Sequence, residues 1–440
     1  MIKFFFDLSI VESLLATMLM SVSMGLIGTL CVVKKKSLNG EMLSHSALPG
    51  VALSYILFGA LSSRHEFFFS LILILITFLI CLLSQAISAK LLKHQLSEDA
   101  TLCVMLSFGL GFGILLQSFL QKFHPMWFKK TQLFFYGQAA TLVWEHVYLY
   151  ALLCFVLAVF IVIFHTRIKW YLFDEHFFKA HQCEIKWIEV LIDILITLAI
   201  VIGIRSCGVI LVSGMLIIPV IAARSLSSSL KWVYTLSAFI GAISAFIGNY
   251  LSFNLPIVFA QKFAMSATIA LGPVMIIVAF SICLLILLLS PKKGLIACGF
   301  KQIFYFLKVQ KENALKRLWI HRENDGFTLA KLFRLFGVSY LSFCLLMINF
   351  ILSGTLKKVG SKLFLTKKGL KQVAHIVRIH RLFELYLSKH LNVDLKNVHG
   401  IAEELEHVIS DDMENQMSIL LNHPTKDPHQ QPIPPDRGHV

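Results

Sequence analysis

Long apolar stretches recur along the first two thirds of the chain, and short polar segments separate them. Stretches of roughly 17 to 24 apolar residues are long enough to cross a bilayer. They predict about nine spans, near residues 10–33, 41–60, 67–89, 101–120, 147–165, 188–206, 207–223, 232–252 and 268–290. The division at 206/207 is the least distinct. The pattern therefore predicts an all-α polytopic membrane domain.

Composition supports this prediction. The chain has 57% hydrophobic and 15% charged residues, and its mean hydropathy is +0.75. These values exclude an ordinary soluble globular protein of this length. The cysteines form no CxxC pair and mostly lie in apolar runs, so we expect buried thiols instead of a disulfide framework or a zinc site.

Basic residues predict the orientation of the spans. They gather on one side, which the positive-inside rule makes the cytosol. The set is Lys34, Lys35, Lys36, Lys90, Lys93, Arg167, Lys169, Lys179, Lys186, Arg224, Lys231, Lys292 and Lys293. Lys122, Lys129 and Lys130 lie on the other side and reduce the contrast. An odd number of spans puts the amino terminus outside and everything after Pro291 inside. Residues 1–33 lack a basic n-region and a cleavage site, so we expect a first span and no removable signal peptide.

Glu41 and His45 lie four residues apart within an apolar stretch. This spacing places a carboxylate and an imidazole on one helix face, where burial is costly unless they serve an ion path or each other. The pair is therefore a candidate translocation site. The alternative is that Glu41 lies at the membrane edge beside the lysines and that His45 bonds a backbone carbonyl.

The segment 35–52, in which Glu41 and His45 precede Leu48-Pro49-Gly50, resembles the signature of bacterial ABC importer permeases for zinc, manganese and iron. Residues 208–226 are similar to a second family segment. The resemblance implies a permease domain at 1–293, a metal path through Glu41 and His45, and an ATPase contact at Ala222, Ala223 and Arg224. Arg224 could instead be an interfacial cation. Two departures are Glu41, usually Asp, and Ser266-Ala267-Thr268, usually Gly-Ala or Gly-Pro.

No Walker A sequence occurs in the chain, so a separate ATPase subunit must hydrolyse the nucleotide. The chain is then a permease subunit and not itself an enzyme. The resemblance also implies an extracytoplasmic metal-binding protein, a second permease subunit or copy, the bacterial inner membrane as location, and Mn, Fe or Zn as cargo. A permease for large ligands such as vitamin B12 or siderophores is a more remote option, because it would not need the Glu41 and His45 pair.

The composition changes after Pro291. A basic block, 301–381, precedes an acidic block, 382–440, which suggests a nucleic-acid-binding part followed by a different one. The acidic block and the residues just before it carry imidazoles and carboxylates at helical spacing, a pattern that suits a transition metal. These candidate ligands are His380, Glu384, His399, Glu403, Glu406 and His407. The alternative is a helix surface with solvated side chains.

This ligand run looks very much like the metal-binding and dimerisation domain of iron- and manganese-dependent, diphtheria-toxin-repressor-like transcriptional repressors. The resemblance covers about 315–434. It implies a linker at 294–312, a winged helix-turn-helix at 313–372, and an α-helical metal-binding and dimerisation domain at 373–440 that forms a homodimer. Glu403, Glu406, His407 and His380 match family ligands, while Glu384 and His399 match an ancillary site. Oxygen and nitrogen ligands favour Mn(II) or Fe(II).

The resemblance also has departures in the DNA-binding part. Where the family has two further ligands, this chain has Asn313 and Lys316, and a charged lysine cannot ligate a metal. The expected recognition helix, 339–352, is apolar and offers few side chains that read bases. The candidate DNA contacts are Ser339, Tyr340, Ser342, Lys357, Lys358, Lys362, Lys367 and Lys368.

Two functions remain open. The first is a divalent-metal permease fused to a cytosolic metal-dependent repressor that binds operator DNA. The second is a transporter only, whose carboxy-terminal domain senses metal and regulates transport without binding DNA. Because a membrane-tethered head must wait for DNA to come to it, proteolytic release of the repressor is a further hypothesis.

Overall fold

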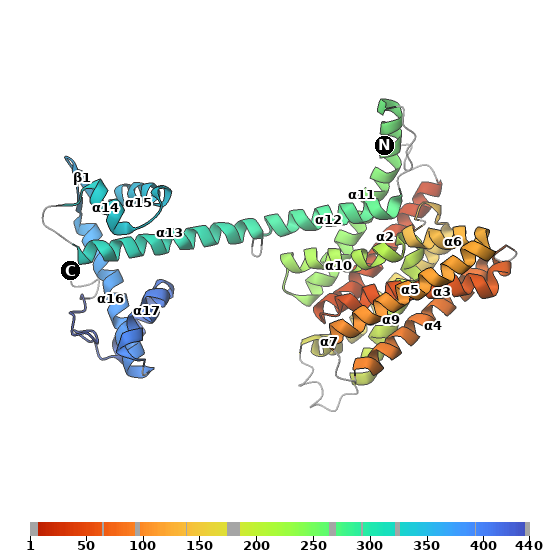
Figure 1. The fold of residues 1–440 in the computed structure, drawn as a ribbon, viewed down its shortest axis with the longest axis horizontal. Helices are drawn as coiled ribbons and strands as arrows, with labels where there is room; N and C mark the ends of the chain where they lie inside the picture. Colours follow the sequence, from red (N-terminus) through yellow and green to blue (C-terminus); the bar gives the residue numbers. More distant parts are fainter. Residues whose placement is uncertain are drawn as a thin grey trace. The chain divides into compact units, whose positions relative to one another are not determined.

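The computed structural model describes residues 8–63, 66–92, 97–137, 139–173, 185–263, 270–291, 294–321, 326–391 and 393–435. The chain divides into two compact units, Met1–Ala297 and Cys298–Val440 (Figure 1). We call them the membrane unit and the carboxy-terminal unit. The expected family segment Ser266-Ala267-Thr268 and the lysines Lys93, Lys179, Lys292 and Lys293 lie outside the described residues.

The membrane unit is a bundle of helices. Its elements are α2 (Leu8–Val33), α3 (Ser37–Phe58), η1 (Gly59–Ser63), α4 (Glu66–Leu92), α5 (Glu98–Phe123), α6 (Pro125–Tyr136), η2 (Ala139–Thr141), α7 (Trp144–Phe173), α9 (Ile185–Cys207), α10 (Val209–Leu226), α11 (Leu230–Phe263) and α12 (Leu271–Leu289). Eight helices in the described part are long and apolar enough to cross a membrane. They match eight of the nine predicted spans.

Helix α10 lies at the remaining predicted span, 207–223. It runs over 18 residues, Val209–Leu226, so its position and length agree with the stretch predicted at 207–223. Its described apolar part, Leu211–Leu226, is shorter than the eight candidate spans. Its beginning lies against the turn after α6, because a side chain at Gly137 would collide with the backbone of Ser206 and Cys207. Near its end, the Ser290 hydroxyl donates to the carbonyl of Ser225 (2.9 Å).

The two ends of α10 therefore lie at opposite faces of the bundle. Val220 and Ala222 pack in one cluster with Val32 at the end of α2 and Leu287 at the end of α12. The chain consequently leaves α12 at the same face as the Lys34–Lys36 turn. That face is the one to which the sequence assigned the basic loops.

Helix α3 is held in the bundle by close approach of neighbouring backbones. A Cβ atom on Gly113 of α5 would lie 2.7 Å from the Cβ of Leu48, and one on Gly50 would lie 2.7 Å from the Cα of Thr77 in α4. Glycine at these positions lets α4 and α5 pack tightly on α3. The segment that carries Glu41 and His45 is thus fixed on two sides.

The carboxy-terminal unit begins within a long helix. Its elements are α13 (Leu295–Ile320), α14 (Leu329–Phe336), α15 (Tyr340–Leu352), β1 (Leu356–Val359), β2 (Lys362–Leu365), α16 (Lys367–His390), α17 (Leu395–Leu405), η3 (Glu406–Val408) and α18 (Asp411–Leu420). Most of the segment expected as a linker, 294–312, is therefore helical. Helix α16 likewise continues across the expected boundary at 372/373.

Side-chain caps and a glycine define the short helices. The backbone N–H groups of Lys331, Ser342 and Gly369 each donate to the hydroxyl three residues earlier, on Thr328, Ser339 and Thr366. These bonds satisfy N–H groups that the first helical turn leaves unpaired. Gly337 adopts φ +61° and ends α14 in the left-handed conformation.

Strands β1 and β2 form an antiparallel hairpin, with Val359 opposite Lys362 and Gly360 at φ +65° in the turn. Phe327 adds an isolated bridge, because it exchanges two 2.8 Å backbone hydrogen bonds with Leu363. One core joins α13 to α16 through Leu318, Phe336, Phe350 and Val373. Helices α14 and α15 are apolar together but bent by 117°, and they belong to this core.

Candidate metal centre

His380 and Glu384 lie one turn apart on α16, and both side chains are buried. Residues at i and i+4 share a helix face, so both point toward His399 on α17. His380 Nε2 lies 3.1 Å from Glu384 Oε1 and 3.1 Å from His399 Nδ1, and His399 Nδ1 lies 2.8 Å from Glu384 Oε1. The three predicted ligands thus offer two nitrogens and one carboxylate oxygen at a single point.

The electrostatics of this cluster are those of a buried ion-pair network. Burial alone lowers the pKa of His380, but hydrogen bonds to Glu384 and Glu406 outweigh it, and the pKa is raised. For Glu384, burial opposes ionisation, while the hydrogen bonds to His380 and His399 dominate and lower the pKa to about 2. The carboxylate is therefore ionised at neutral pH, as a metal ligand must be.

A cleft of about 690 Å³ opens onto these three residues. Its other lining residues include Lys316, Asp427 and His429. His399 keeps 62% of its side-chain surface exposed, so an ion can reach the cluster from solvent. The donor set of imidazole and carboxylate fits a divalent ion such as Mn(II) or Fe(II).

Glu406 and His407 are buried beside this centre, but they have other partners. His380 Nδ1 contacts Glu406 Oε2, and the Lys316 ammonium donates to Glu406 Oε1 at 2.9 Å. His407 Nδ1 pairs with Glu312 Oε2 at 2.7 Å, and in the described residues its Nε2 has no hydrogen bond. These residues do not fit a metal site in this arrangement, because a lysine ammonium lies among the candidate ligands.

Glu403 lies apart from the rest of the predicted set. Its side chain is exposed on α17. Among the described residues, it belongs to neither of the two groups of side chains that could hold a metal ion. Conversely, sequence reasoning missed Glu312 of α13 as the partner of His407. The only available signal was a carboxylate next to Asn313 in a basic helix.

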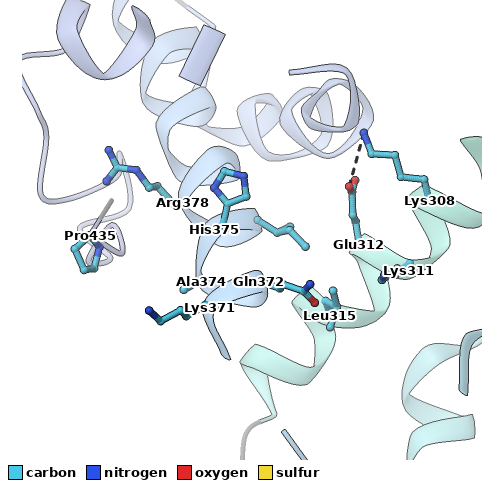
Figure 2. Close-up of a pocket in the computed structure, with 11 residues that line it drawn as sticks. Lys308, Lys311, Glu312, Leu315, Lys371, Gln372, Ala374, His375, Arg378 and Pro435 are labelled. Carbon is cyan, nitrogen blue, oxygen red and sulfur yellow. Dashed lines mark ion pairs between the residues drawn. The ribbon is translucent and has the colours of Figure 1, made fainter. Parts of the chain in front are cut away.

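Sequence reasoning also missed a second group, His375, Asp411 and Glu414, which gather within 4.8 Å of one another. Figure 2 shows Lys308 and Glu312 from α13 and His375 and Arg378 from α16 around one cleft. Arg378 Nε donates to Glu414 Oε1 at 2.9 Å, and Asp411 is 67% exposed. Glu414 is therefore engaged in an ion pair.

In the membrane unit, Glu41 and His45 lie one turn apart on α3, and both are half-buried. Within the described residues, His45 Nδ1 is buried without a hydrogen bond. Pro49 has no N–H, so the carbonyl of His45 also lacks the usual helical donor. His45 therefore has both a buried ring nitrogen without a hydrogen bond and a carbonyl oxygen without its helical donor. The Glu41 carboxylate lies one turn away on the same helix.

The predicted ATPase contact lies at the end of α10. Ala222 and Ala223 are fully buried against α11 and α12, whereas Arg224 is exposed. The short turn Ser227–Ser229 follows and leads into α11. Of the three predicted contact residues, Arg224 is the one whose side chain faces outward.

The predicted DNA contacts lie on α15, the hairpin and the start of α16. Ser339 and Tyr340 are exposed, Ser342 is half-buried, and Lys357, Lys358, Lys362, Lys367 and Lys368 are exposed. Apart from Asn349, the rest of the exposed face of α15 is apolar. Its large exposed side chains are Tyr340, Leu341, Leu345, Ile348, Ile351 and Leu352.

Comparison with known proteins gives two family matches. Residues 7–290 match the ABC 3 transport family, and residues 366–435 match the iron dependent repressor, metal binding and dimerisation domain. The chain is 31% identical over 443 residues to the probable metal transport system membrane protein of Chlamydia trachomatis serovar D, covering 98% of this chain and 97% of that protein.

Further similarities concern sequence and fold. The chain is 28% identical over 381 residues to manganese transport system membrane protein MntC of Bacillus subtilis strain 168, covering 85% of this chain and 83% of that protein. Among solved structures, PsaBC from Streptococcus pneumoniae in complex with Fab matches with a TM-score of 0.55 and 23% identity, covering 66% of this chain and 95% of that one. At this identity the likeness concerns the fold alone.

Proposed function

The chain belongs to the ABC 3 transport family over residues 7–290, and from this premise we propose that its membrane unit is the transmembrane subunit of an ABC importer for Mn, Fe or Zn. The carboxy-terminal unit is a metal-responsive regulator fused to it. The observation that carries this proposal is the His380–Glu384–His399 cluster, which lies within the segment similar to metal-dependent repressors. The test is uptake of radiolabelled Mn(II), Fe(II) and Zn(II) by cells that express the chain with its partners.

The cargo passes Glu41 and His45 in this proposal. Support comes from the half-buried pair at i and i+4, and from His45 Nδ1, which is buried without a hydrogen bond among the described residues. An ionisable pair inside a membrane helix is costly, and an ion path is a common reason for it.

The partners follow from the family. A separate ATPase docks at the turn that bears Arg224, an extracytoplasmic protein delivers the metal, and a second permease subunit or copy completes the channel. The carboxy-terminal unit lies in the cytosol, since it follows α12 at the face of the lysine-rich turn. The location is the bacterial cytoplasmic membrane.

For the carboxy-terminal unit we propose a winged helix-turn-helix at 313–372 and a metal-binding dimerisation domain at 373–440 that forms a homodimer. Helices α14 and α15 with the β1–β2 hairpin support the first part. Lys357, Lys358 and Lys362 of the hairpin, with Lys367 and Lys368, contact phosphates of operator DNA, while Ser339, Tyr340 and Ser342 face its bases. Mn(II) or Fe(II) at His380, Glu384 and His399 regulates this binding.

A second candidate is favoured by the apolar exposed face of α15, which offers few groups for base readout. In this alternative the unit senses metal and regulates transport without touching DNA. A gel shift with the full chain in nanodiscs, with and without Mn(II), separates the two. A metal-dependent shift that Lys357→Ala plus Lys358→Ala weakens supports the repressor, and an absent shift with metal-dependent uptake supports the alternative.

The repressor proposal includes release of the carboxy-terminal unit by proteolysis, because tethered heads wait for DNA to come to the membrane. Immunoblotting with an antibody against residues 380–434 tests it. A soluble fragment beside the full-length band is expected. If only the membrane-bound chain is found, the unit acts at the membrane.

A further inference from the structure

The imidazole of His380 divides the predicted ligands into two halves. On the Nε2 side lie Glu384 and His399, which face an open cleft. On the Nδ1 side lie Glu406 and Lys316. Both sides use the same ring, but they face different surroundings and different charges.

The Nδ1 half already contains a cation. The Lys316 ammonium lies 2.9 Å from Glu406 Oε1 and 3.2 Å from His380 Nδ1. Only 11% of the Lys316 side chain and 2% of the Glu406 side chain are exposed. An ammonium group has three donors and no acceptor, so it satisfies the Glu406 oxygen that faces it in the way a bound cation would.

Most of the remaining ligand atoms on this side are also occupied or turned away. Among the described residues the exception is His407 Nε2, which is buried without a hydrogen bond, 3.9 Å from Glu406 Oε1. Both oxygens of Glu406 have partners, His380 and Lys316. His407 Nδ1 is paired with Glu312, whose other oxygen lies 3.8 Å from Lys308. Glu403 points to solvent. A metal ion here would have to displace a buried ion pair and come to rest beside an ammonium charge.

We propose that Lys316 is a built-in substitute for a second metal ion. The carboxy-terminal unit then holds a single ion, at the Nε2 half, and its helix α13 is joined to α16 and η3 by the lysine without metal. The inference rests on the proposed function only in that the Nε2 half binds a metal.

The proposal predicts what Lys316→Glu should do. The substitution removes the ammonium and adds a carboxylate beside Glu406, His407 and Glu312, which together make an oxygen- and nitrogen-rich set suited to Mn(II). Lys316→Met removes the charge but adds no ligand. Lys301→Glu is the matched control, since Lys301 is an exposed lysine on the same helix.

The experiment counts Mn(II) bound to the full chain in detergent, by equilibrium dialysis and elemental analysis. All variants carry Glu41→Ala and His45→Ala, so that the membrane unit contributes no ion at that pair. We expect one ion per chain in this background, in Lys316→Met and in Lys301→Glu, and two in Lys316→Glu. Addition of His399→Ala should remove one ion from each. Two ions in the background chain, or one ion in a folded Lys316→Glu variant, would overturn the proposal.

A second measurement needs no substitution of Lys316. Hydrogen exchange of the chain with and without Mn(II) should show added protection in α17 peptides around His399. Peptides of α13 around Lys316 should be protected equally in both conditions, because the lysine makes their contact. If Mn(II) raises protection in α13 at least tenfold, a metal and not the lysine holds that helix. Loss of uptake or of DNA binding would concern the proposed function and leave the ion count unaffected.

Discussion

His380 contacts two carboxylates, one through each ring nitrogen, and both carboxylates are ionised at neutral pH. In the metal-free protein the network is most favourable when the imidazole carries its proton. A metal ion at Nε2 instead requires a lone pair there. In the proposed function the same residue would therefore stabilise the unit in two ways, with a proton at low pH and with a metal at higher pH.

The pKa shifts predict how the stability of the metal-free unit depends on pH. The pKa of His380 is raised, so its stabilisation is complete below its ordinary value of 6.5 and is lost as pH rises through the raised value. The pKa of Glu384 is lowered from 4.5 to about 2, so its contribution is present above 4.5 and is lost as pH falls toward 2. Hydrogen exchange of α16 peptides should therefore show the greatest protection between pH 4.5 and pH 6.5, where both contributions are present. In Glu384→Gln this maximum should flatten, and an unchanged profile would contradict the network.

Single substitutions can show whether Mn(II) depends on the residues that the geometry brings together or also on Glu403, which the family resemblance assigns as a ligand. His399→Ala and Glu384→Ala remove donors from the cluster and should lower Mn(II) affinity about 10- to 100-fold or more. Glu403→Ala removes an exposed carboxylate on the same helix as His399 and should change affinity less than twofold. Calorimetry on the full chain measures all three. An equal loss in Glu403→Ala would mean that α17 rotates when metal binds.

The cluster itself could be predicted from sequence, because i, i+4 spacing places His380 and Glu384 on one face of α16 whatever the tertiary fold. The role of Glu403 could not, since a matched position does not say which way the side chain faces. The contact of Glu312 could not be predicted from the sequence either. This residue pairs with His407 across 95 residues of sequence, and no local pattern encodes that contact.

At the scale of elements, α3 is the helix on which transport should depend. Glu41→Ala or His45→Ala should abolish metal uptake while the chain still inserts, because a helix face with its ion ligands removed cannot replace the hydration of a cation. Glu145→Ala and His165→Ala on α7 are controls of the same residue types and should transport normally. Uptake measurements with matched membrane expression test this. Normal uptake of every divalent metal in both α3 variants would exclude the path.

The close packing of α3 predicts a contrast between two glycines of one helix. Gly113→Ala puts a Cβ 2.7 Å from Leu48, whereas a Cβ on Gly111 meets nothing within 4 Å. Overpacking costs about 1–3 kcal/mol, so Gly113→Ala should unfold more easily than Gly111→Ala by that amount. Thermal unfolding in detergent measures the difference. Equal melting of the two variants would show that α5 can shift away from α3.

The long spans were predictable because only their length and apolar content matter in a membrane. Helix α10 was predicted with nearly its observed bounds, but its separation from α9 was the least distinct division, since the two helices meet at a single glycine, Gly208. Helix α6 was missed altogether. Its proline at the first turn was a start signal, but its mixed polar and aromatic sequence resembles a loop.

At the scale of the whole molecule, the change of composition after Pro291 indicated two units, and the structure divides the chain near that point. The nature of the junction was not predictable from the change alone. Residues 295–306 are rich in exposed apolar side chains, including Phe300, Ile303 and Phe304, and they continue as helix α13 into the carboxy-terminal unit. A change in charge identifies a boundary but does not indicate a flexible connection.

The continuity of the chain from the last span into a dimerisation segment has a consequence for assembly. In an importer with two copies of this permease, the two carboxy-terminal units are tethered to one complex. Their association is then intramolecular, and its effective concentration depends on the length and stiffness of the connection instead of on the concentration of free subunits. Where the connection lets the two units meet, assembly of the proposed transporter would favour their pairing. A metal ion at the proposed site would then act on the shape of a pair that assembly has already formed.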